Sequence, residues 1–164
     1  MRTEHNKAHV ASAAATVATN ATQKLTFDTS GFDTANVKVL VGTNATTSAT
    51  FTSMAWSESD TVTNVSSMTS IASLTGGTAT SSTVGFVLPG AAGTALGGGV
   101  ACEFQIDLRN RKKYLGLEVT PAQSLVFGVV ADLTKDQSAD TTTEKTESNI
   151  ESTSVTSCAK IVAG

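Results

Sequence analysis

Short runs in which apolar and polar residues alternate recur along this sequence, and they constrain its fold more than any other feature. In FQIDL, residues 104–108, Phe104, Ile106 and Leu108 alternate with polar residues. A period of two is typical of a β-strand with one buried face, because successive side chains point to opposite sides of a sheet. ATFTSMAW, residues 49–56, also alternates, which predicts that Met54 and Trp56 lie on one face and Phe51 on the other.

The composition agrees with β-structure. Ser and Thr make up more than a quarter of the chain, while aromatic residues account for 5% and charged residues for 15%. Thr and Val lose side-chain freedom in helices and fit the pleated surface of a sheet. About seven or eight strands are expected. They predict an all-β fold, an antiparallel β-sandwich of jelly-roll or immunoglobulin-like type with extended N- and C-terminal segments.

A chain of 164 residues is the size of one domain. Residues 1–22 show no clear apolar face and are expected to form an N-terminal arm or an extended edge segment. Residues 23–164 are expected to form a single sandwich domain with long loops at 57–99 and 134–152. Short strands near Ile71–Leu74 and Val84–Leu88 are expected within the first of these loops, and SVTSCAKIVAG offers a final strand.

A basic cluster interrupts the alternation after residue 108. Four of the eleven Lys and Arg residues of the chain are Arg109, Arg111, Lys112 and Lys113, although the net charge is -3. The apolar runs on either side predict a β-hairpin with the cluster at its tip. Two interpretations remain open. The cluster is either a solvated turn or a contact with an acidic patch on a partner protein, since Arg pairs well with carboxylates.

Trp56 is the only tryptophan and is expected to be a core or interface anchor, which makes it a further candidate for partner binding. Catalytic signatures are lacking, so we expect a protein that is not an enzyme and that has no cofactor or metal. The only histidines, His5 and His9, have the spacing of two metal ligands on a helix, but the residues between them supply no general base. The glycines of GTALGGGVA lack the lysine of a phosphate-binding loop.

Charge and hydropathy restrict the partners. A pI near 5.3 argues against nucleic acid, which requires a basic face. No apolar run approaches the length of a membrane helix, and the N-terminus makes a poor signal peptide, so no membrane partner is expected. Cys102 and Cys158 are interpreted as buried thiols or, as the alternative, as a disulfide.

Several segments together resemble small virion proteins of tailed bacteriophages. They are GFDTANVKVLVG, the residues WSESD at 56–60, and IDLRNRKKYLGLEVTPA, followed by an apolar strand. The most specific element, DLRNRKKYLGLEV, is similar to a motif of that group in which glycine is common at the position of Asn110. The resemblance covers about residues 25–135.

This resemblance implies a capsid decoration, or cement, protein. Such a protein sits on the outer surface of an icosahedral head after assembly in the host cytoplasm, commonly as a homotrimer, and bridges subunits of the major capsid protein. The alternative is a tail- or fibre-associated module that recognises the host or binds carbohydrate through Trp56 and the long loops.

Overall fold

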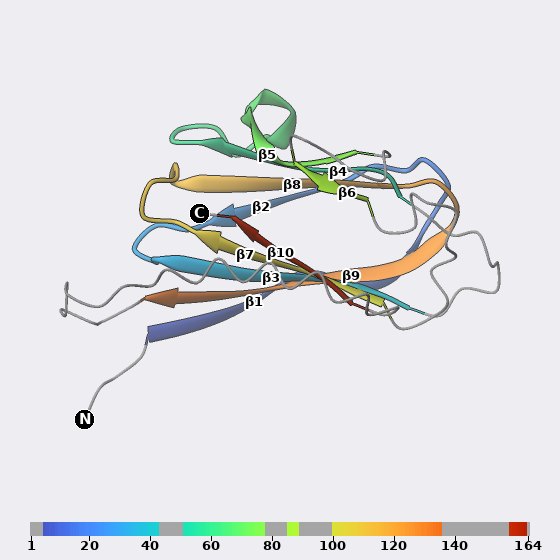
Figure 1. Cartoon of the computed structure of the whole chain (residues 1–164), viewed down its shortest axis with the longest axis horizontal. Helices are drawn as coiled ribbons and strands as arrows, with labels where there is room; N and C mark the ends of the chain where they lie inside the picture. The colour runs from blue at the N-terminus through green and yellow to red at the C-terminus, as the bar shows by residue number, and fades with distance from the viewer. Residues whose placement is uncertain (1–4, 43–50, 78–84, 89–99, 136–157, 164) are drawn as a thin grey trace.

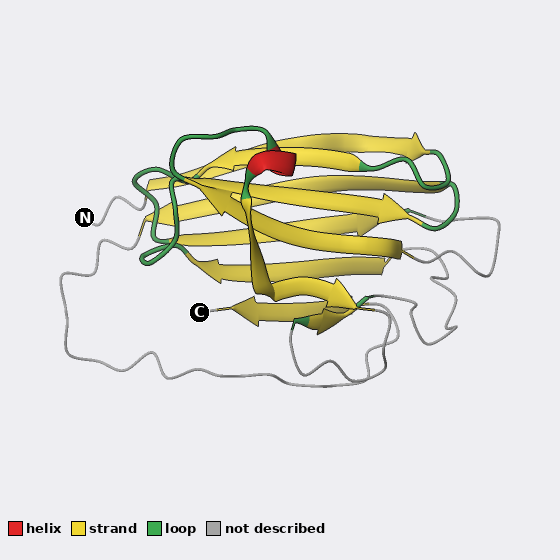
Figure 2. Ribbon diagram, turned by 90° about the horizontal axis from the view of Figure 1, so that it is seen from above, coloured by secondary structure: helices red, strands yellow, loops and turns green. Residues whose placement is uncertain are grey.

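A computed structural model describes residues 5–42, 51–77, 85–88, 100–135 and 158–163, which form two packed β-sheets (Figure 1). Sheet A has the order β1-β9-β3-β7-β10 and sheet B the order β2-β8-β4-β5-β6. Figure 2 shows the strands of both sheets running along the long axis of the molecule. The strands of sheet A are β1 (His5–Val17), β9 (Leu125–Lys135), β3 (Thr34–Val41), β7 (Val100–Asp107) and β10 (Cys158–Ala163). Those of sheet B are β2 (Gln23–Asp28), β8 (Tyr114–Pro121), β4 (Phe51–Ser59), β5 (Thr69–Gly77) and β6 (Phe86–Val87), with a short 3-10 turn, η1 (Val65–Ser67), between β4 and β5.

The strand pairing confirms the expected all-β sandwich and identifies its topology. Four antiparallel pairs are nested along the chain: β1 with β9, β2 with β8, β3 with β7, and β4 with β5. The first and third pairs lie in sheet A, and the other two lie in sheet B. This nested order is that of a jelly roll, to which β6 and β10 are added as parallel edge strands.

The core lies between the sheets and is built by the alternation seen in the sequence. Val37 and Val39 point inward from β3, and Leu115 and Leu117 point inward from β8. Trp56 of sheet B packs edge-on against Phe104 of sheet A, with ring centroids 5.3 Å apart. Side chains from both layers therefore interdigitate, as sandwich cores do.

The side of the sheet predicted for the first residue of β4 is wrong. Met54 and Trp56 point into the core as expected, but Phe51 is buried as well. The register between β4 and β8 shifts between Phe51 and Ser53, which adds one residue to the strand. Such a bulge reverses the side to which a residue points, and the alternation of the sequence does not reveal it.

The predicted hairpin around the basic cluster is also wrong. β7 belongs to sheet A and β8 to sheet B, so residues 108–113 cross from one sheet to the other. An apolar face turned to the core has the same period of two in either sheet. The sequence pattern therefore cannot distinguish a hairpin from a connection between layers.

Within residues 57–99, the structure contains the expected short strands. β5 includes Ile71–Leu74, and β6 lies within Val84–Leu88. The rest of this loop beyond residue 77, apart from 85–88, and the loop beyond residue 135 lie outside the described residues. At the N-terminus, β1 runs antiparallel to β9 as an edge strand of sheet A.

Candidate interaction site

The connection between β7 and β8, residues 108–113, lies at one end of the sandwich beside the connection between β2 and β3, residues 29–33. Both connections cross between the sheets. The backbone N–H of Leu108 donates to the carbonyl of Asp33 at 2.8 Å, and Thr29 donates to the carbonyl of Lys113 from its N–H at 3.0 Å and from its hydroxyl at 2.8 Å. Leu108 and Thr29 are buried beneath the two connections. These bonds fix the backbone from which the basic side chains project.

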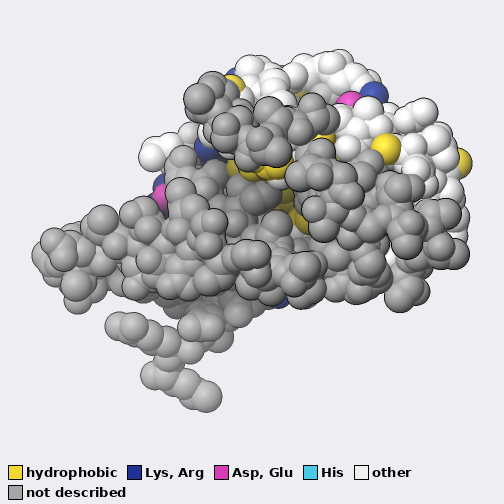
Figure 3. All heavy atoms as spheres, turned by 45° about the vertical axis from the view of Figure 1, so that its right-hand side comes forward, with side chains coloured by type: hydrophobic (Ala, Val, Ile, Leu, Met, Phe, Trp, Pro, Cys, Tyr) yellow, Lys and Arg dark blue, Asp and Glu magenta, His cyan; other side chains and the backbone are white. Residues whose placement is uncertain are grey.

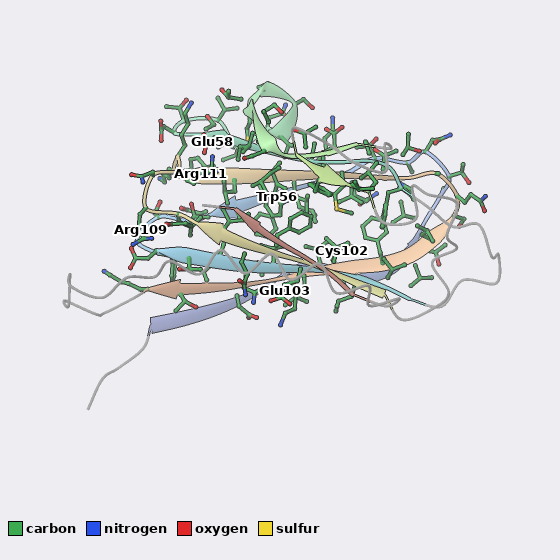
Figure 4. All side chains as sticks on the ribbon, in the orientation of Figure 1. Trp56, Glu58, Cys102, Glu103, Arg109 and Arg111 are labelled. Carbon is green, nitrogen blue, oxygen red and sulfur yellow. The ribbon has the colours of Figure 1, made fainter. Side chains whose placement is uncertain are left out.

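Arg109, labelled in Figure 4, is the more exposed of the two arginines, with 69% of its side chain accessible. It folds back onto Asp107. Its Nε donates to Asp107 Oδ1 at 2.9 Å, its Nη2 contacts Oδ2, and its backbone N–H donates to Oδ1 at 3.0 Å. The hydrogen bond from the Arg109 side chain lowers the pKa of Asp107, and partial burial opposes this shift only in part. Asp107 therefore holds the arginine at the surface as an ionised carboxylate.

Arg111 lies deeper and faces sheet B. Its Nη1 is 3.9 Å from Oε2 of Glu58 on β4, and Figure 4 shows the two side chains at the same end of the molecule. The backbone N–H of Lys112 donates to Glu58 Oε2 at 3.4 Å, and that of Lys113 donates to Asp60 Oδ1 at 3.2 Å. Carboxylates at and just after the end of β4 therefore anchor the connection to sheet B.

Lys113 is exposed, and its ammonium lies 4.8 Å from the centroid of the Tyr114 ring. This distance permits a cation–π contact. A side-chain hydrogen bond with Tyr114 is the main cause that raises the pKa of Lys113, with smaller contributions from the charges of Tyr114 and Asp28. Lys113 is therefore cationic at neutral pH. Lys112 is half-buried.

The electrostatic character of this end of the sandwich is balanced rather than basic. The cations of the connection lie among carboxylates from β2, β4, β7 and the segment after β4. The four cations are Arg109, Arg111, Lys112 and Lys113, and the four carboxylates are Asp28, Glu58, Asp60 and Asp107. Balanced charges produce only a short-ranged field, so a partner would be contacted by individual exposed side chains.

Trp56 does not belong to this surface. Its side chain is 0% exposed, packed between Phe27 at 5.8 Å and Phe104 at 5.3 Å, measured between ring centroids. Its indole Nε1 has no hydrogen-bond partner among the described residues. The residue is a core anchor and presents no surface to a partner.

The other candidates lie mostly outside the described side chains. His5 and His9 fall on β1 and Cys158 falls on β10, and for these three residues only the backbone is described. Cys102 is buried in the core. No group of three or more His, Cys, Asp or Glu residues that could hold a metal occurs among the residues that were described. No helix in this part of the chain is long and apolar enough to span a membrane.

A polar network on the outer face of sheet A was not anticipated from the sequence. Asn36 Nδ2 donates to Glu103 Oε1 at 2.8 Å, and Gln105 Nε2 lies 3.5 Å from the same oxygen. Lys38 and Lys160 occupy the register positions opposite Glu103 on the strands to either side. The outward residues of alternating strands are the signal for such a network, but only the strand order shows which of them are neighbours.

Comparison with protein-family models, with curated proteins and with solved structures found no match for this chain.

Proposed function

We propose that this protein is a virion structural protein that decorates the head of a tailed phage and stabilises it by bridging subunits of the major capsid protein. The proposal includes a non-catalytic role, a position on the outer surface of the head and assembly as a homotrimer. The phage-like motif DLRNRKKYLGLEV supports it at the level of sequence. A jelly roll is compatible with it, although a fold alone does not define a function.

The observation that carries the proposal is the placement of the two terminal strands. β1 and β10 form opposite edges of the same sheet, and among the described strands each pairs with a single neighbour. An edge strand presents a row of backbone N–H and C=O groups that can pair with another chain. A protein that uses both edges of this sheet in this way can contact two neighbours at once, as bridging requires.

The exposed cations supply a second contact in this proposal. Arg109 and Lys113 project from the β7–β8 connection, with Lys112 half-buried beside them. Arg109 pairs with Asp107 but is exposed, so it and Lys113 can reach acidic groups on a capsid subunit, whereas Arg111 is mostly buried against Glu58. The carbohydrate-binding alternative combined Trp56 with the long loops, and Trp56 cannot contribute to such a surface because it is buried in the core.

The test is to locate and count the protein in virions of the phage that encodes it. Quantitative mass spectrometry should give hundreds of copies per particle, and cryo-electron microscopy should place them on the head. Heads assembled without the protein should lose their DNA at a lower temperature than complete heads. Adding the purified protein should restore the release temperature of complete heads. A few tens of copies confined to the tail would instead favour host recognition.

A further inference from the structure

The edge of β7 is a binding slot for a β-strand, and β10 occupies it. β10 runs parallel to β7 from the pair Cys158 and Ala101 to the pair Ala163 and Ile106. The inward side chains of β7 in this stretch, Cys102, Phe104 and Ile106, are all 0% exposed. The slot thus lies directly beside the core of the sandwich.

Beside the slot, the outermost strands of the two sheets are short: β10 has six residues and β6 has two. On the facing sheet the edge strand is β6, and its Phe86 packs against Phe104 with ring centroids 5.3 Å apart. Figure 3 shows hydrophobic side chains visible between residues that are not described. A strand on β7 provides backbone hydrogen bonds along this edge and completes sheet A.

The path of the chain allows this strand to come from another molecule. β9 ends near Thr34, at one end of sheet A, whereas β10 begins beside Ala101 at the opposite end. Returning along the sheet requires about 26 Å, given a rise of about 3.3 Å per residue over eight residues. The intervening segment, 136–157, has 22 residues and can span about 70 Å when extended.

We propose that β10 is an exchangeable strand, which completes the β7 edge of its own molecule or of a second copy of this chain. The length of segment 136–157 permits both arrangements, and its sequence is dominated by Thr, Ser, Asp and Glu, which suit a link between molecules in water. Exchange of an identical element needs no new interface, because the donated strand makes the same contacts in either copy. Strands donated around a ring of copies would build a closed oligomer.

A disulfide trap in the full-length chain tests this proposal. Ala159 lies opposite Cys102 in the register, so the variant Cys158→Ser/Ala159→Cys places a cysteine pair between β10 and β7. Tagged and untagged chains are unfolded, mixed, refolded at high concentration and oxidised with diamide. If strands are exchanged, a non-reducing gel should show disulfide-linked dimers or larger oligomers that contain both tagged and untagged chains. Exclusively intrachain links between the peptides containing residues 102 and 159, or no link at all, would overturn the proposal.

The matched control is Cys158→Ser alone, which retains only Cys102 and should give no covalent oligomer. A second measurement avoids cysteines. Glu103→Lys and Lys160→Glu each place like charges opposite one another within one chain, whereas strands exchanged between the two variants restore opposite charges. Native mass spectrometry of the mixture should show mixed oligomers in excess over those of either variant alone, and their absence would contradict exchange. Both experiments use purified protein, so their result is independent of the proposed role on a phage head.

Discussion

Arg111 Nη1 and Glu58 Oε2 lie 3.9 Å apart, and this pair joins the β7–β8 connection to the end of β4. The two side chains are only 16% and 17% exposed. A charge pair this far from solvent depends on both partners, because removing one leaves the other with little hydration. Arg111 is therefore part of the structure of this end of the sandwich, whereas Arg109 lies at its surface.

Replacing these two arginines should have different effects on stability. Arg111→Ala leaves the Glu58 carboxylate poorly compensated and should lower the free energy of unfolding by about 1–2 kcal/mol. Arg109→Ala removes an exposed pair and should change it by less than about 0.5 kcal/mol. Urea unfolding at neutral pH measures both. Equal losses in the two variants would mean that the Arg111 pair contributes no more than a surface ion pair.

Adjacent glycines at the end of β5 give a sharper contrast. A Cβ at position 76 would lie 2.8 Å from the carbonyl oxygen of Met54 and would overlap Leu88 Cδ2, whereas a Cβ at position 77 meets nothing within 4 Å. Gly76→Ala should therefore destabilise the protein by about 1–3 kcal/mol. Gly77→Ala should leave stability unchanged or raise it by up to about 1 kcal/mol. Thermal and chemical unfolding of the pair compare them, and a tolerated Gly76→Ala would show that β4 and Leu88 can move apart.

Asp107 should give the stability of the protein a dependence on acid pH. Its pKa is lowered in the folded state, chiefly by the hydrogen bond from Arg109. Its ionised form therefore stabilises the fold fully above the pKa of the unfolded chain, about 3.9, and this contribution disappears as pH falls through the lower folded value. The difference in unfolding free energy between wild type and Asp107→Asn should be largest at neutral pH and should shrink below about pH 4.

Urea unfolding at pH 7 and pH 3 measures that difference, and an NMR titration of Asp107 provides the control. In Arg109→Gln the Asp107 pKa should move back toward its ordinary value, because the charged donor is gone. If the difference in unfolding free energy between wild type and Asp107→Asn stays constant from pH 7 to pH 3, the effect of the substitution does not come from the ionisation of Asp107.

The fold class could be predicted from the sequence because alternation records which residues face a core. It located the inward face of β7 and most of that of β4 correctly. Alternation carries no information about which sheet a strand joins, so the same pattern was misinterpreted as a hairpin between β7 and β8. The polar and alanine-rich residues of β1 show no clean period, and the pairing of that strand with β9 emerges only from the structure.

The candidate site was less predictable for a related reason. The basic cluster stands out in the sequence, but its carboxylate partners Glu58 and Asp60 lie about fifty residues earlier in the chain. Their proximity depends on β4 and β8 being neighbours in sheet B. Trp56 was recognised as an anchor, and only its burial decides between core and interface.

The difference in exposure between Arg109 and Arg111 leads to a prediction for the proposed attachment to a phage head. If Arg109 and Lys113 contact acidic groups of a capsid subunit, Arg109→Glu/Lys113→Glu should weaken attachment by about two- to fivefold per charge. Because salt screens exposed charges over about 8 Å at physiological ionic strength, the weakening should be greatest at low salt. Sedimentation of purified variants with heads that lack the protein measures the bound fraction. Lys38→Glu on the outer face of sheet A matches the charge change of either single reversal, Arg109→Glu or Lys113→Glu, and is their control.

Arg111→Ala separates binding from folding in the same assay. Below its unfolding temperature it should attach as wild type does, because its guanidinium is turned toward Glu58 rather than toward a partner. If neither salt nor Arg109→Glu/Lys113→Glu changes the bound fraction, the basic cluster serves only to connect the two sheets at this end of the sandwich. The edge strands β1 and β10 would then have to provide the contact, through backbone hydrogen bonds that salt screens weakly.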